Sequence, residues 1–518
     1  MRAIFKKTKK LAKTIIEKLP HNFKKFFYLT WHKIRNFSLL PATSIKTNDI
    51  VVSPEESTLK LVGFLKIHNE SSEGNLTRIL THMQQFCDDI VVCDCESTDD
   101  SLDVAKKFTN HILQEPNDFE KEIFTKQKIL EYTLSLDPDW IVWLDADEVF
   151  DRQGELNGVR RLCAYGEEKN IDAFSFLEYN LWRSKDWFRV DEFFSKGWFV
   201  RLWKNNGALK FDIKEGLHQN QYPLGIKNIE RSDIKVIHYG FSSSKLIEKK
   251  YTRYKKYGQK GFYLDRFKDE KGIKLSPFSI DWFPLSHFNI SVVCLIYKST
   301  KYIDFVWNSF NKYTKKENVE FLFVANDATK RVKNYLKEKN LPHLIFDNAD
   351  KEEYYLNRVY RAWNYGGFNA SGDIIVFVNS DMAFSHNWLE NLLKSIKKDR
   401  IVCSRLIESG KMLTGKHGIN RNFGQTHEEF NNEDFQSFAE KIKKAEIREG
   451  GLFMPCAIYK QSFIKSGGYP IGNRQEEDGS ETSGDYILFY EKLKLMGISH
   501  FTSFDSIVYH IQEGEMDD

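Results

Sequence analysis

Short runs of hydrophobic residues alternate along this chain with longer stretches in which the hydrophobic positions have the spacing of an amphipathic helix. The runs at 59–67 ("LKLVGFLKI") and 290–297 ("ISVVCLIY") are β-rich, and each opens such an alternation. Because these runs are apolar at nearly every position, they indicate strands that are buried on both faces of a sheet. The pattern therefore predicts an α/β fold with mostly parallel sheets.

Four features recur in the same order in the two halves of the chain: an opening strand, a second strand ending in Asp, a third strand running into an acid, and a late strand running into His. The residues that mark the repeat are, in pairs, Asp94 and Asp327, Asp147 and Asp381, and His238 and His510. The two acids are 53 residues apart in the first half and 54 in the second. We therefore predict two copies of one α/β domain.

The length of 518 residues exceeds what one ordinary hydrophobic core holds. The repeat places the predicted domains at 58–240 and 288–518. Residues 241–287 are rich in Lys, Tyr and Phe, and we expect a helix and a connector there. Residues 1–57 remain as a separate N-terminal arm.

Both third strands end in a polar triplet. "WIVWLDADE" supplies Asp145 and Asp147, and "IIVFVNSDM" supplies Asn379 and Asp381. Ligands of such sheets bind at the carboxyl ends of strands, where two carboxylates can hold Mg²⁺ or Mn²⁺ and leave positions for phosphate oxygens. A D-x-D triplet alone is equally typical of a solvated turn, but the long buried strand and the duplication favour a metal-diphosphate site.

Several motifs carry a family resemblance. "HNESSEGNLTRIL", "DDIVVCDCESTDDSLDVAKKF" and "DWIVWLDADEVFD" resemble the nucleotide-binding half of family 2 glycosyltransferases of the GT-A fold, above all bacterial lipopolysaccharide-core and capsule enzymes. "FVAND", "NYGGFNASGDIIVFVNSDM", "GGYP" and "SGDYILFYEKLKLMG" are similar to the same superfamily, with looser motifs. The resemblance covers most of 58–240 and 288–512. It implies two tandem GT-A (Rossmann-like) domains that bind nucleotide sugars, UDP-sugars foremost.

The resemblance also implies roles for the residues at the strand ends. The implied donor-binding residues are Asp94, Asp99, Asp145, Asp327 and Asn379. The implied ligands of Mn²⁺ or Mg²⁺ are Asp145, Asp147, Asp381, His238 and His510. Two alternatives stay open: Asp99 as the N-cap of a helix that begins near Ser101, and the histidines as hydrogen-bonded core residues. Because Asn379 replaces an acid, we expect weaker metal binding in the second copy.

Inverting transfer by direct displacement needs a base that takes the proton of the acceptor hydroxyl. "GDYILFYEKL" resembles the acidic motif before the acceptor-side helix, which makes Asp485 the expected base and Glu481 its substitute. An N-cap role for Asp485 is compatible with catalysis, because a cap position exposes the carboxylate. The first copy has Gln219 where related enzymes commonly carry Glu. The candidate bases there are Glu215, Asp212 and Asp191.

The N-terminal arm is basic, whereas the rest of the chain is mildly acidic. Residues 1–50 contain twelve Lys and Arg against Glu17 and Asp49, and hydrophobic residues recur among these lysines at near-helical spacing. We expect residues 1–35 to contact the inner face of the cell membrane as a peripheral helix; the alternative is a basic helix packed on the body. Seven cysteines without paired short spacings indicate a cytoplasmic protein, and the missing recognition motif argues against nucleic acid.

The leading hypothesis is a bifunctional glycosyltransferase of the hexosyltransferase type. Each domain would move a sugar from a nucleotide diphosphate to a glycan or lipid-linked acceptor, in a growing capsule or lipopolysaccharide. In one alternative only one copy is catalytic and the other is a scaffold, which the departures at Asn379 and Gln219 support. The other is a non-catalytic carbohydrate-binding protein, against which the intact Asp145, Asp147 and Glu148 argue.

Overall fold

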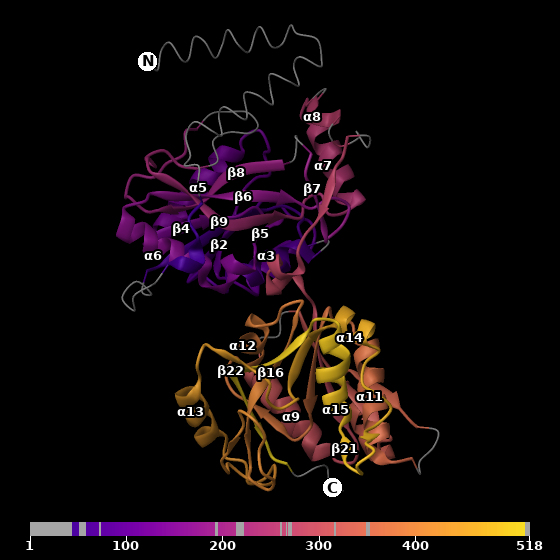
Figure 1. The fold of residues 1–518 in the computed structure, drawn as a ribbon. Helices are drawn as coiled ribbons and strands as arrows, with labels where there is room; N and C mark the ends of the chain where they lie inside the picture. Colours follow the sequence, from indigo (N-terminus) through magenta and orange to yellow (C-terminus); the bar gives the residue numbers. More distant parts are fainter. Residues whose placement is uncertain are drawn as a thin grey trace. The chain divides into compact units, whose positions relative to one another are not determined.

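The chain folds into two compact units that divide between Ser286 and His287. The computed structural model describes residues 44–50, 59–71, 74–191, 195–213, 222–259, 262–265, 267, 272–314, 318–348 and 353–512 (Figure 1). The predicted membrane contact of residues 1–35 therefore lies outside the described residues. Within the described ranges, no helix combines the length and the apolar character needed to cross a membrane.

The first unit is built on an eight-stranded sheet in the order β3-β2-β1-β4-β8-β6-β9-β5. Its strands are β1 (Leu61–Ile67), β2 (Asp89–Asp94), β3 (His111–Gln114), β4 (Trp140–Trp143), β5 (Glu148–Phe150), β6 (Ala173–Asn180), β8 (Ser195–Lys204) and β9 (Ile229–His238). Its main helices are α3 (Asn75–Met83), α4 (Ser101–Lys106), α5 (Glu122–Leu134), α6 (Val159–Lys169), α7 (Ser244–Lys256) and α8 (Phe262–Asp265). A small ribbon pairs β7 (Trp187–Arg189) with β10 (Leu275–Pro277).

The second unit is built on a sheet in the order β13-β12-β11-β14-β19-β16-β22-β15. Its strands are β11 (Ile290–Ile296), β12 (Val319–Asn326), β13 (His343–Phe346), β14 (Ile374–Asn379), β15 (Met382–Phe384), β16 (Arg400–Glu408), β19 (Cys456–Tyr459) and β22 (Ser499–His510). Two short strands pair at its side, β17 (Ile419–Asn420) with β16 and β18 (Ile447–Glu449) with β22. Its main helices are α9 (Thr300–Tyr313), α10 (Lys330–Glu338), α11 (Tyr355–Asn369), α12 (Trp388–Lys394), α13 (Asn432–Ile442), α14 (Lys460–Ser466) and α15 (Gly484–Tyr486).

The two sheets have the same strand order and the same pairing directions. In the first, β3, β2, β1 and β4 are parallel, β8 is antiparallel to both of its neighbours, β6 and β9 are parallel, and β5 is antiparallel to β9. The second repeats this arrangement from β13 to β15. The predicted α/β class is thus confirmed, but the sheets are mixed rather than mostly parallel. The antiparallel pairings involve the strands in the later half of each unit. A hydrophobic run does not reveal the direction of its strand, so the sequence did not predict these pairings.

The strand registers relate individual residues of the two units. Leu61 pairs with Trp140, and Ile290 pairs with Ile374. At the other side of each sheet, the residue after the acid pairs with the late histidine, as Glu148 with His238 and Met382 with His510. The correspondences that follow are Asp145 with Asn379, Asp147 with Asp381, Glu148 with Met382, Asn180 with Glu408, Arg201 with Cys456, and His238 with His510.

The same registers change one predicted correspondence, that of Asp94 with Asp327. Ile67 is opposite Asp94 in the first unit, and Ile296 is opposite Ala325 in the second. Asp327 therefore corresponds to Glu96, two residues beyond Asp94. Backbone geometry agrees, because Glu96 and Asp327 both have a positive φ, 54° and 48°. Non-glycine residues rarely adopt this conformation, so the two units make the same turn at this point.

Close packing of helices on the second sheet depends on the "GG" of the motif "NYGGFN". A Cβ on Gly366 would lie 2.7 Å from side-chain atoms of Val293 and Val324, and one on Gly367 would lie 2.6 Å from Phe463. Both distances are shorter than real Cβ contacts. The two glycines thus let α11 lie directly against β11, β12 and α14.

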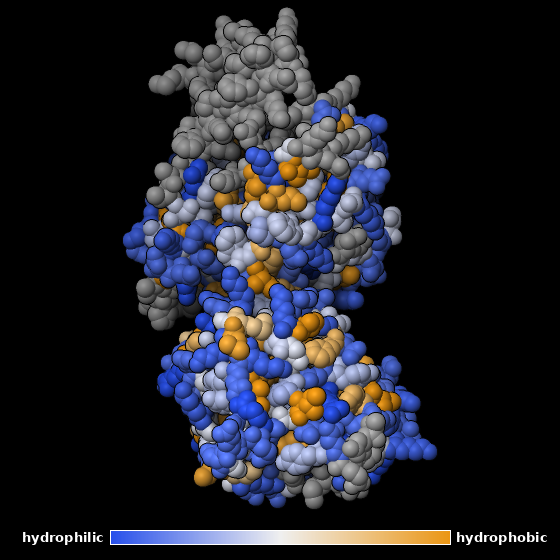
Figure 2. All heavy atoms as spheres, turned by 45° about the vertical axis from the view of Figure 1, so that its right-hand side comes forward, coloured by the Kyte–Doolittle hydropathy of each residue, from blue (hydrophilic) through white to orange (hydrophobic). Residues whose placement is uncertain are grey.

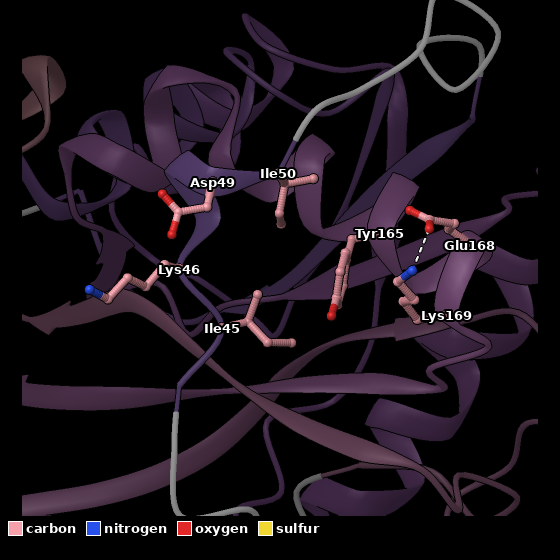
Figure 3. Close-up of a pocket in the computed structure, with 7 residues that line it drawn as sticks. All are labelled: Ile45, Lys46, Asp49, Ile50, Tyr165, Glu168 and Lys169. Carbon is pink, nitrogen blue, oxygen red and sulfur yellow. Dashed lines mark hydrogen bonds and ion pairs between the residues drawn. The ribbon is translucent and has the colours of Figure 1, made fainter.

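The surface of both units is mostly hydrophilic on the face shown in Figure 2, with hydrophobic side chains exposed in small groups. A cavity of about 500 Å³ lies in the first unit beside the segment 44–50 (Figure 3). It is lined by Ile45, Lys46, Asp49, Ile50, Tyr165, Glu168 and Lys169. None of the predicted site residues lines this cavity, so the candidate chemistry lies elsewhere.

Candidate active site

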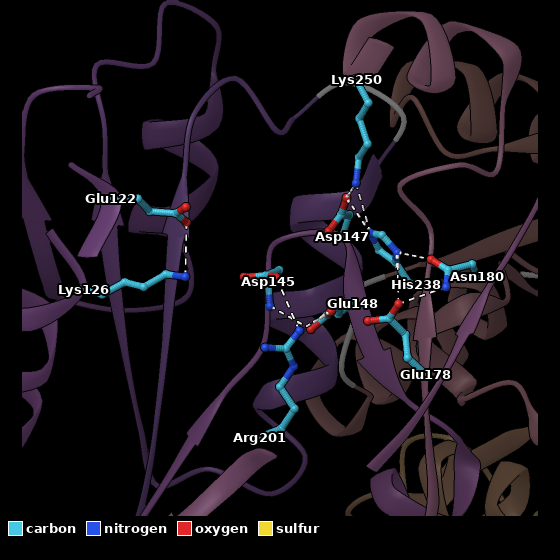
Figure 4. A network of polar contacts seen from close by, with 10 residues as sticks. All are labelled: Glu122, Lys126, Asp145, Asp147, Glu148, Glu178, Asn180, Arg201, His238 and Lys250. Carbon is cyan, nitrogen blue, oxygen red and sulfur yellow. Dashed lines mark hydrogen bonds and ion pairs between the residues drawn. The ribbon is translucent and has the colours of Figure 1, made fainter. Parts of the chain in front are cut away.

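The first site lies where β4 ends and β5 begins, with Asp147 at its centre (Figure 4). The Asp147 carboxylate is largely buried, and its Oδ2 accepts a hydrogen bond from Lys250 Nζ at 2.9 Å. Its backbone carbonyl accepts from Tyr239 N–H at 2.7 Å. Burial by itself would raise the pKa of Asp147, but Lys250 and His238 outweigh burial and hold this pKa well below its ordinary value. Asp147 is therefore an anion at neutral pH.

His238 lies beside this carboxylate, at the end of β9. Lys250 Nζ lies 3.0 Å from His238 Nε2, and His238 Nδ1 lies 2.6 Å from Asn180 Oδ1. Since an amide oxygen only accepts, Nδ1 carries a proton, and Nε2 faces both Lys250 Nζ and Asp147 Oδ2, the latter at 3.2 Å. Asn180 Nδ2 in turn donates to Glu178 Oε1 at 2.9 Å. The result is one continuous chain of hydrogen bonds from α7 through β9 to β6.

Asp145 and Glu148 share a different cation. Arg201 Nη2, from β8, lies 2.5 Å from Glu148 Oε1 and 3.4 Å from Asp145 Oδ2. Burial opposes the charge of the Arg201 guanidinium, but Glu148 and Asp145 beside it raise its pKa. The side chains of Arg201 and Glu148 are 4% and 2% exposed, whereas that of Asp145 is 48% exposed. Asp145 is thus the acid of the triplet that faces solvent.

Asp94 and Asp99 follow β2 at the same edge of the sheet. Asp94 is 2% exposed, and its buried Oδ1 has no hydrogen-bond partner among the described residues. Asp99 Oδ1 accepts from Ser101 N–H at 3.0 Å and its Oδ2 from the Ser71 hydroxyl at 2.8 Å. The N-cap position of α4 is Asp100. Asp99 therefore stabilises the start of this helix from the position just before the N-cap residue.

The second site repeats the acid and the histidine with different partners. Asp381 is 6% exposed, and its Oδ2 lies 3.3 Å from His510 Nε2. His510 Nδ1 lies 3.2 Å from Glu408 Oε1. Burial alone would lower the pKa of His510, but Asp381 and Glu408 raise it to about 10. The imidazolium therefore lies between two carboxylates, whereas His238 contacts the Asp147 carboxylate, the Lys250 ammonium and the Asn180 amide.

Three linked exchanges separate the two sites. The ion pair of Glu148 and Arg201 corresponds in register to Met382 and Cys456, and both of these are buried. Asn379 stands in the place of Asp145, the third member of the charged group. A buried ion pair and a buried apolar pair are alternative solutions for the same space.

Asp327, predicted to bind a donor, is hydrogen-bonded to residues of its own unit. It accepts hydrogen bonds from Asn348 N–H and Asn348 Nδ2, both at 2.8 Å, and from Arg358 Nη1 at 3.1 Å. The contrast with the unpaired Oδ1 of Asp94 follows from the two-residue shift in register.

Asp485 lies in the first turn of α15 and faces α11. Its Oδ2 accepts from the Tyr360 hydroxyl at 3.1 Å, and burial raises the pKa of Asp485 to about 6. The N-cap of α15 is Ser483, whose hydroxyl accepts from Tyr486 N–H, so Asp485 is not the cap. Glu481 is exposed on the short strand β21 (Glu481–Thr482) and accepts from Gln475 Nε2. The two candidate bases thus lie in different environments, and the raised pKa of Asp485 suits proton transfer near neutral pH.

The candidate bases of the first unit are not brought to the Asp147 site by any recorded contact. Glu215 and Gln219 fall in 214–221, outside the described residues. Asp191 accepts from Arg189 Nε at 2.5 Å, and Asp212 lies just before the undescribed stretch. The first unit therefore has no acid comparable to Asp485 among these described candidates.

A divalent ion fits the second site better than the first. The described residues contain no ready-made group of three or more His, Cys, Asp or Glu ligands. Asp381 and His510 nevertheless offer one carboxylate and one imidazole, with Glu408 behind the imidazole as metal-binding histidines require. Mg²⁺ and Mn²⁺ sites in proteins that bind nucleotides often use only one or two protein ligands, with phosphate oxygens completing the set. In the first unit, Lys250 fills the equivalent space.

Comparison with known proteins finds a family match in one of the two units. Residues 291–466 match the model of glycosyl transferase family 2. This segment lies within the second unit. The matched segment includes Asp327, Asn379 and Asp381, and it ends before Asp485 and His510. The resemblance is thereby confirmed for the second copy's motifs inside this segment, whereas "GGYP" and "SGDYILFYEKLKLMG" lie beyond it.

Relatives of the chain are also glycosyltransferases. The SPbeta prophage-derived glycosyltransferase SunS of Bacillus subtilis (strain 168) is 25% identical over 255 residues, which are 48% of this chain and 53% of SunS. The chain thus spans about half the length of this relative. Among solved structures, the mannosyltransferase PcManGT from Pyrobaculum calidifontis with GDP-Man and Mn²⁺ has 14% identity and a TM-score of 0.29, covering 44% of this chain and 58% of that one. S. aureus TarS 1–349 with UDP-GlcNAc has 14% identity and a TM-score of 0.31, covering 44% and 62%.

Sequence reasoning missed Lys250, Arg201 and Glu408. Lys250 lies in the stretch assigned to the connector, 103 residues from Asp147. Arg201 and Glu408 lie within hydrophobic runs that predict strands, where an isolated charge was the available signal. A charge inside a buried strand requires a partner, which makes such positions worth examining in other chains.

Proposed function

We propose that this protein is a bifunctional glycosyltransferase with one nucleotide-sugar site in each of two tandem GT-A domains. One observation carries the proposal: sheets of identical order place the pairs Asp147 with His238 and Asp381 with His510 at corresponding strand ends. Strand ends of this kind are where α/β sheets bind nucleotides. Support for the second domain is stronger, because the family match lies within it.

The reaction proposed for the second unit is a direct displacement with inversion. The Asp485 carboxylate takes the proton of an acceptor hydroxyl, whose oxygen then bonds to the anomeric carbon of the donor sugar. The bond from that carbon to the phosphate oxygen breaks, and its electron pair leaves with the nucleoside diphosphate. A pKa of about 6 keeps Asp485 mostly ionised at pH 7 while it remains a useful proton acceptor.

Charge on the departing diphosphate must be offset at the strand end. In the second unit, Asp381 and His510 would hold Mn²⁺ or Mg²⁺, with Glu408 orienting the imidazole. Such an ion supplies positive charge next to the phosphate oxygens. In the first unit, the buried and unpaired Oδ1 of Asp94 is placed to accept a hydrogen bond from the base or ribose of the donor.

The acceptor proposed from the sequence resemblance is a growing cell-surface glycan, of capsule or lipopolysaccharide type, free or lipid-linked. A basic arm on the inner membrane surface would bring a cytoplasmic enzyme to such an acceptor. The charge of residues 1–50 supports this part of the proposal.

The test is release of nucleoside diphosphate from a panel of UDP- and GDP-sugars with Mn²⁺ or Mg²⁺. Wild type is compared with Asp147→Asn and Asp381→Asn, and with Asp103→Asn as a matched control, since the Asp103 side chain is 76% exposed. We expect each site variant to lose turnover of a different donor. Loss with only one variant would favour the single-active-copy alternative, and no turnover of any donor by wild type would refute the proposal.

A further inference from the structure

Asp147 Oδ2 and His238 Nε2 lie 3.2 Å apart, and the ammonium of Lys250 contacts both atoms, at 2.9 and 3.0 Å (Figure 4). Lys250 belongs to α7, which begins at the Ser243 cap and is anchored by buried Leu246 and Ile247. The Lys250 side chain is only 13% exposed. The Lys250 side chain is therefore held in place by its surroundings, unlike that of a mobile surface lysine.

This arrangement uses the atoms that a divalent ion would need. His238 Nδ1 is engaged with Asn180 Oδ1, so Nε2 is the ring nitrogen that faces Asp147 Oδ2. Lys250 Nζ lies within hydrogen-bonding distance of both Nε2 and this carboxylate oxygen. A metal ion at this place would have to displace a positive charge that is held by two hydrogen bonds.

Building on the proposed function, we infer that the first unit binds the diphosphate of its donor without a divalent metal, with the Lys250 ammonium supplying the positive charge. An ammonium has three N–H donors, and two of them serve Asp147 and His238. The third would donate to a phosphate oxygen; apart from these two hydrogen bonds, Nζ lies 4.7 Å from the centre of the Phe241 ring. The second unit, where His510 lies between the carboxylates of Asp381 and Glu408, keeps the metal-dependent mode.

Neighbouring residues of α7 add to this positive charge. Lys249 Nζ donates to the Asn69 carbonyl at 3.1 Å, in the loop that follows β1. Glu70, in the same loop, has its pKa raised to about 7 by burial and by Asp147, although Lys249, Lys250 and Arg253 oppose this shift. The helix thus directs three cations toward the strand ends where the donor would bind.

The bonds that break and form in the transfer step are the same in this inference as in the proposed reaction. The bond between the anomeric carbon and the phosphate oxygen breaks, and its electron pair stays on the nucleoside diphosphate. Lys250 keeps its proton and contributes charge and a hydrogen bond. The acceptor hydroxyl still gives its proton to a separate base.

The test measures binding of UDP and of GDP by isothermal titration calorimetry, in EDTA and in Mn²⁺. It uses the full chain with Asp381→Asn, so that the second site contributes little. We expect one of the two nucleotides to bind with dissociation constants that agree within about twofold in EDTA and in Mn²⁺. Lys250→Met should weaken binding in EDTA about ten- to a hundredfold, as loss of a charge-assisted contact does, and Mn²⁺ should recover part of it. Lys250→Arg should stay within about fivefold.

Lys255→Met is the matched control, because Lys255 is an exposed lysine of the same helix. Binding that requires Mn²⁺ before Lys250 is changed would overturn the inference and leave the proposed function standing. So would a Lys250→Met variant that behaves as Lys255→Met does. If neither nucleotide binds under any condition, the donor site of the first unit fails, and the proposed function of that unit fails with it.

Discussion

Asp485→Asn separates the catalytic role of this residue from its cost to the fold. Burial raises the Asp485 pKa from 3.8 to about 6, and the Tyr360 hydroxyl only partly offsets the effect. The folded state therefore holds the proton more tightly than the unfolded chain. Stability from this group is fully present below pH 3.8 and is lost as the pH rises through about 6. Two pKa units correspond to about 3 kcal/mol, so removing the charge should stabilise the second unit by about 1–3 kcal/mol at pH 7.5.

The same substitution removes the proposed base. We expect turnover at the second site to fall about 10²–10⁴-fold. In wild type, this turnover should rise about tenfold per pH unit below pH 6 and level off above it, because the ionised carboxylate is the active form. Glu481→Gln is the control, since Glu481 is exposed and hydrogen-bonded only to Gln475 among its recorded contacts; its turnover should stay within about twofold.

Thermal unfolding at pH 4 and at pH 7.5 measures the stability effect. A unit of this size shifts its midpoint by about 2–4 °C for each kcal/mol. Asp485→Asn should therefore raise the midpoint of the second unit by about 2–12 °C at pH 7.5 and by much less at pH 4. Equal shifts at the two pH values would refute the burial argument. Retention of wild-type turnover by the variant would refute the assignment of Asp485 as base.

Two further substitutions test the exchanges between the sites. Glu148→Met alone should destabilise the first unit by about 3–5 kcal/mol because it leaves Arg201 charged and buried, whereas Glu148→Met with Arg201→Met should return close to wild type; thermal unfolding decides, and a double variant as unstable as the single one would contradict the reasoning. Glu408→Gln should weaken Mn²⁺ binding at the second site about ten- to a hundredfold, as loss of the carboxylate behind a ligating histidine does. Titration with Mn²⁺ measures this effect, with the exposed Glu428→Gln as control, and unchanged affinity would exclude His510 as a ligand.

The hydrophobic pattern was sufficient to locate the strands that carry the acids and the histidines. Buried strands are recognisable by their hydrophobic composition. A polar residue directly after such a strand must lie at the edge of the sheet where the strand ends. The direction of the later strands was not accessible, because parallel and antiparallel pairings bury similar side chains. The pattern also does not reveal that β8 and β19 each lie between two strands that precede them in the chain.

Residue-level correspondence was harder to predict than the repeat itself. Spacing along the chain matched Asp327 to Asp94, yet the registers match Asp327 to Glu96. Loops between strands can differ by several residues while the sheet stays the same, so a spacing of similar length can conceal a compensating shift. Lys250 was missed for a related reason: its partner Asp147 is distant in sequence, and a Lys-rich stretch gives no indication of which lysine is buried.

The register also changes the meaning of Asn379. In the first unit the exposed Asp145 is accompanied by Arg201, and that guanidinium also neutralises Glu148. In the second unit, Cys456 and Met382 replace the pair, so an Asp at 379 would add a second carboxylate beside Asp381 without the arginine that accompanies it in the first unit. An Asn at 379 is therefore compatible with the loss of the arginine on electrostatic grounds. It retains a carbonyl oxygen for hydrogen bonding, and it does not by itself indicate a copy that has lost its activity. The scaffold alternative for the second unit then loses its main support, while Lys250 makes the first unit the place where a different mode of donor binding is expected.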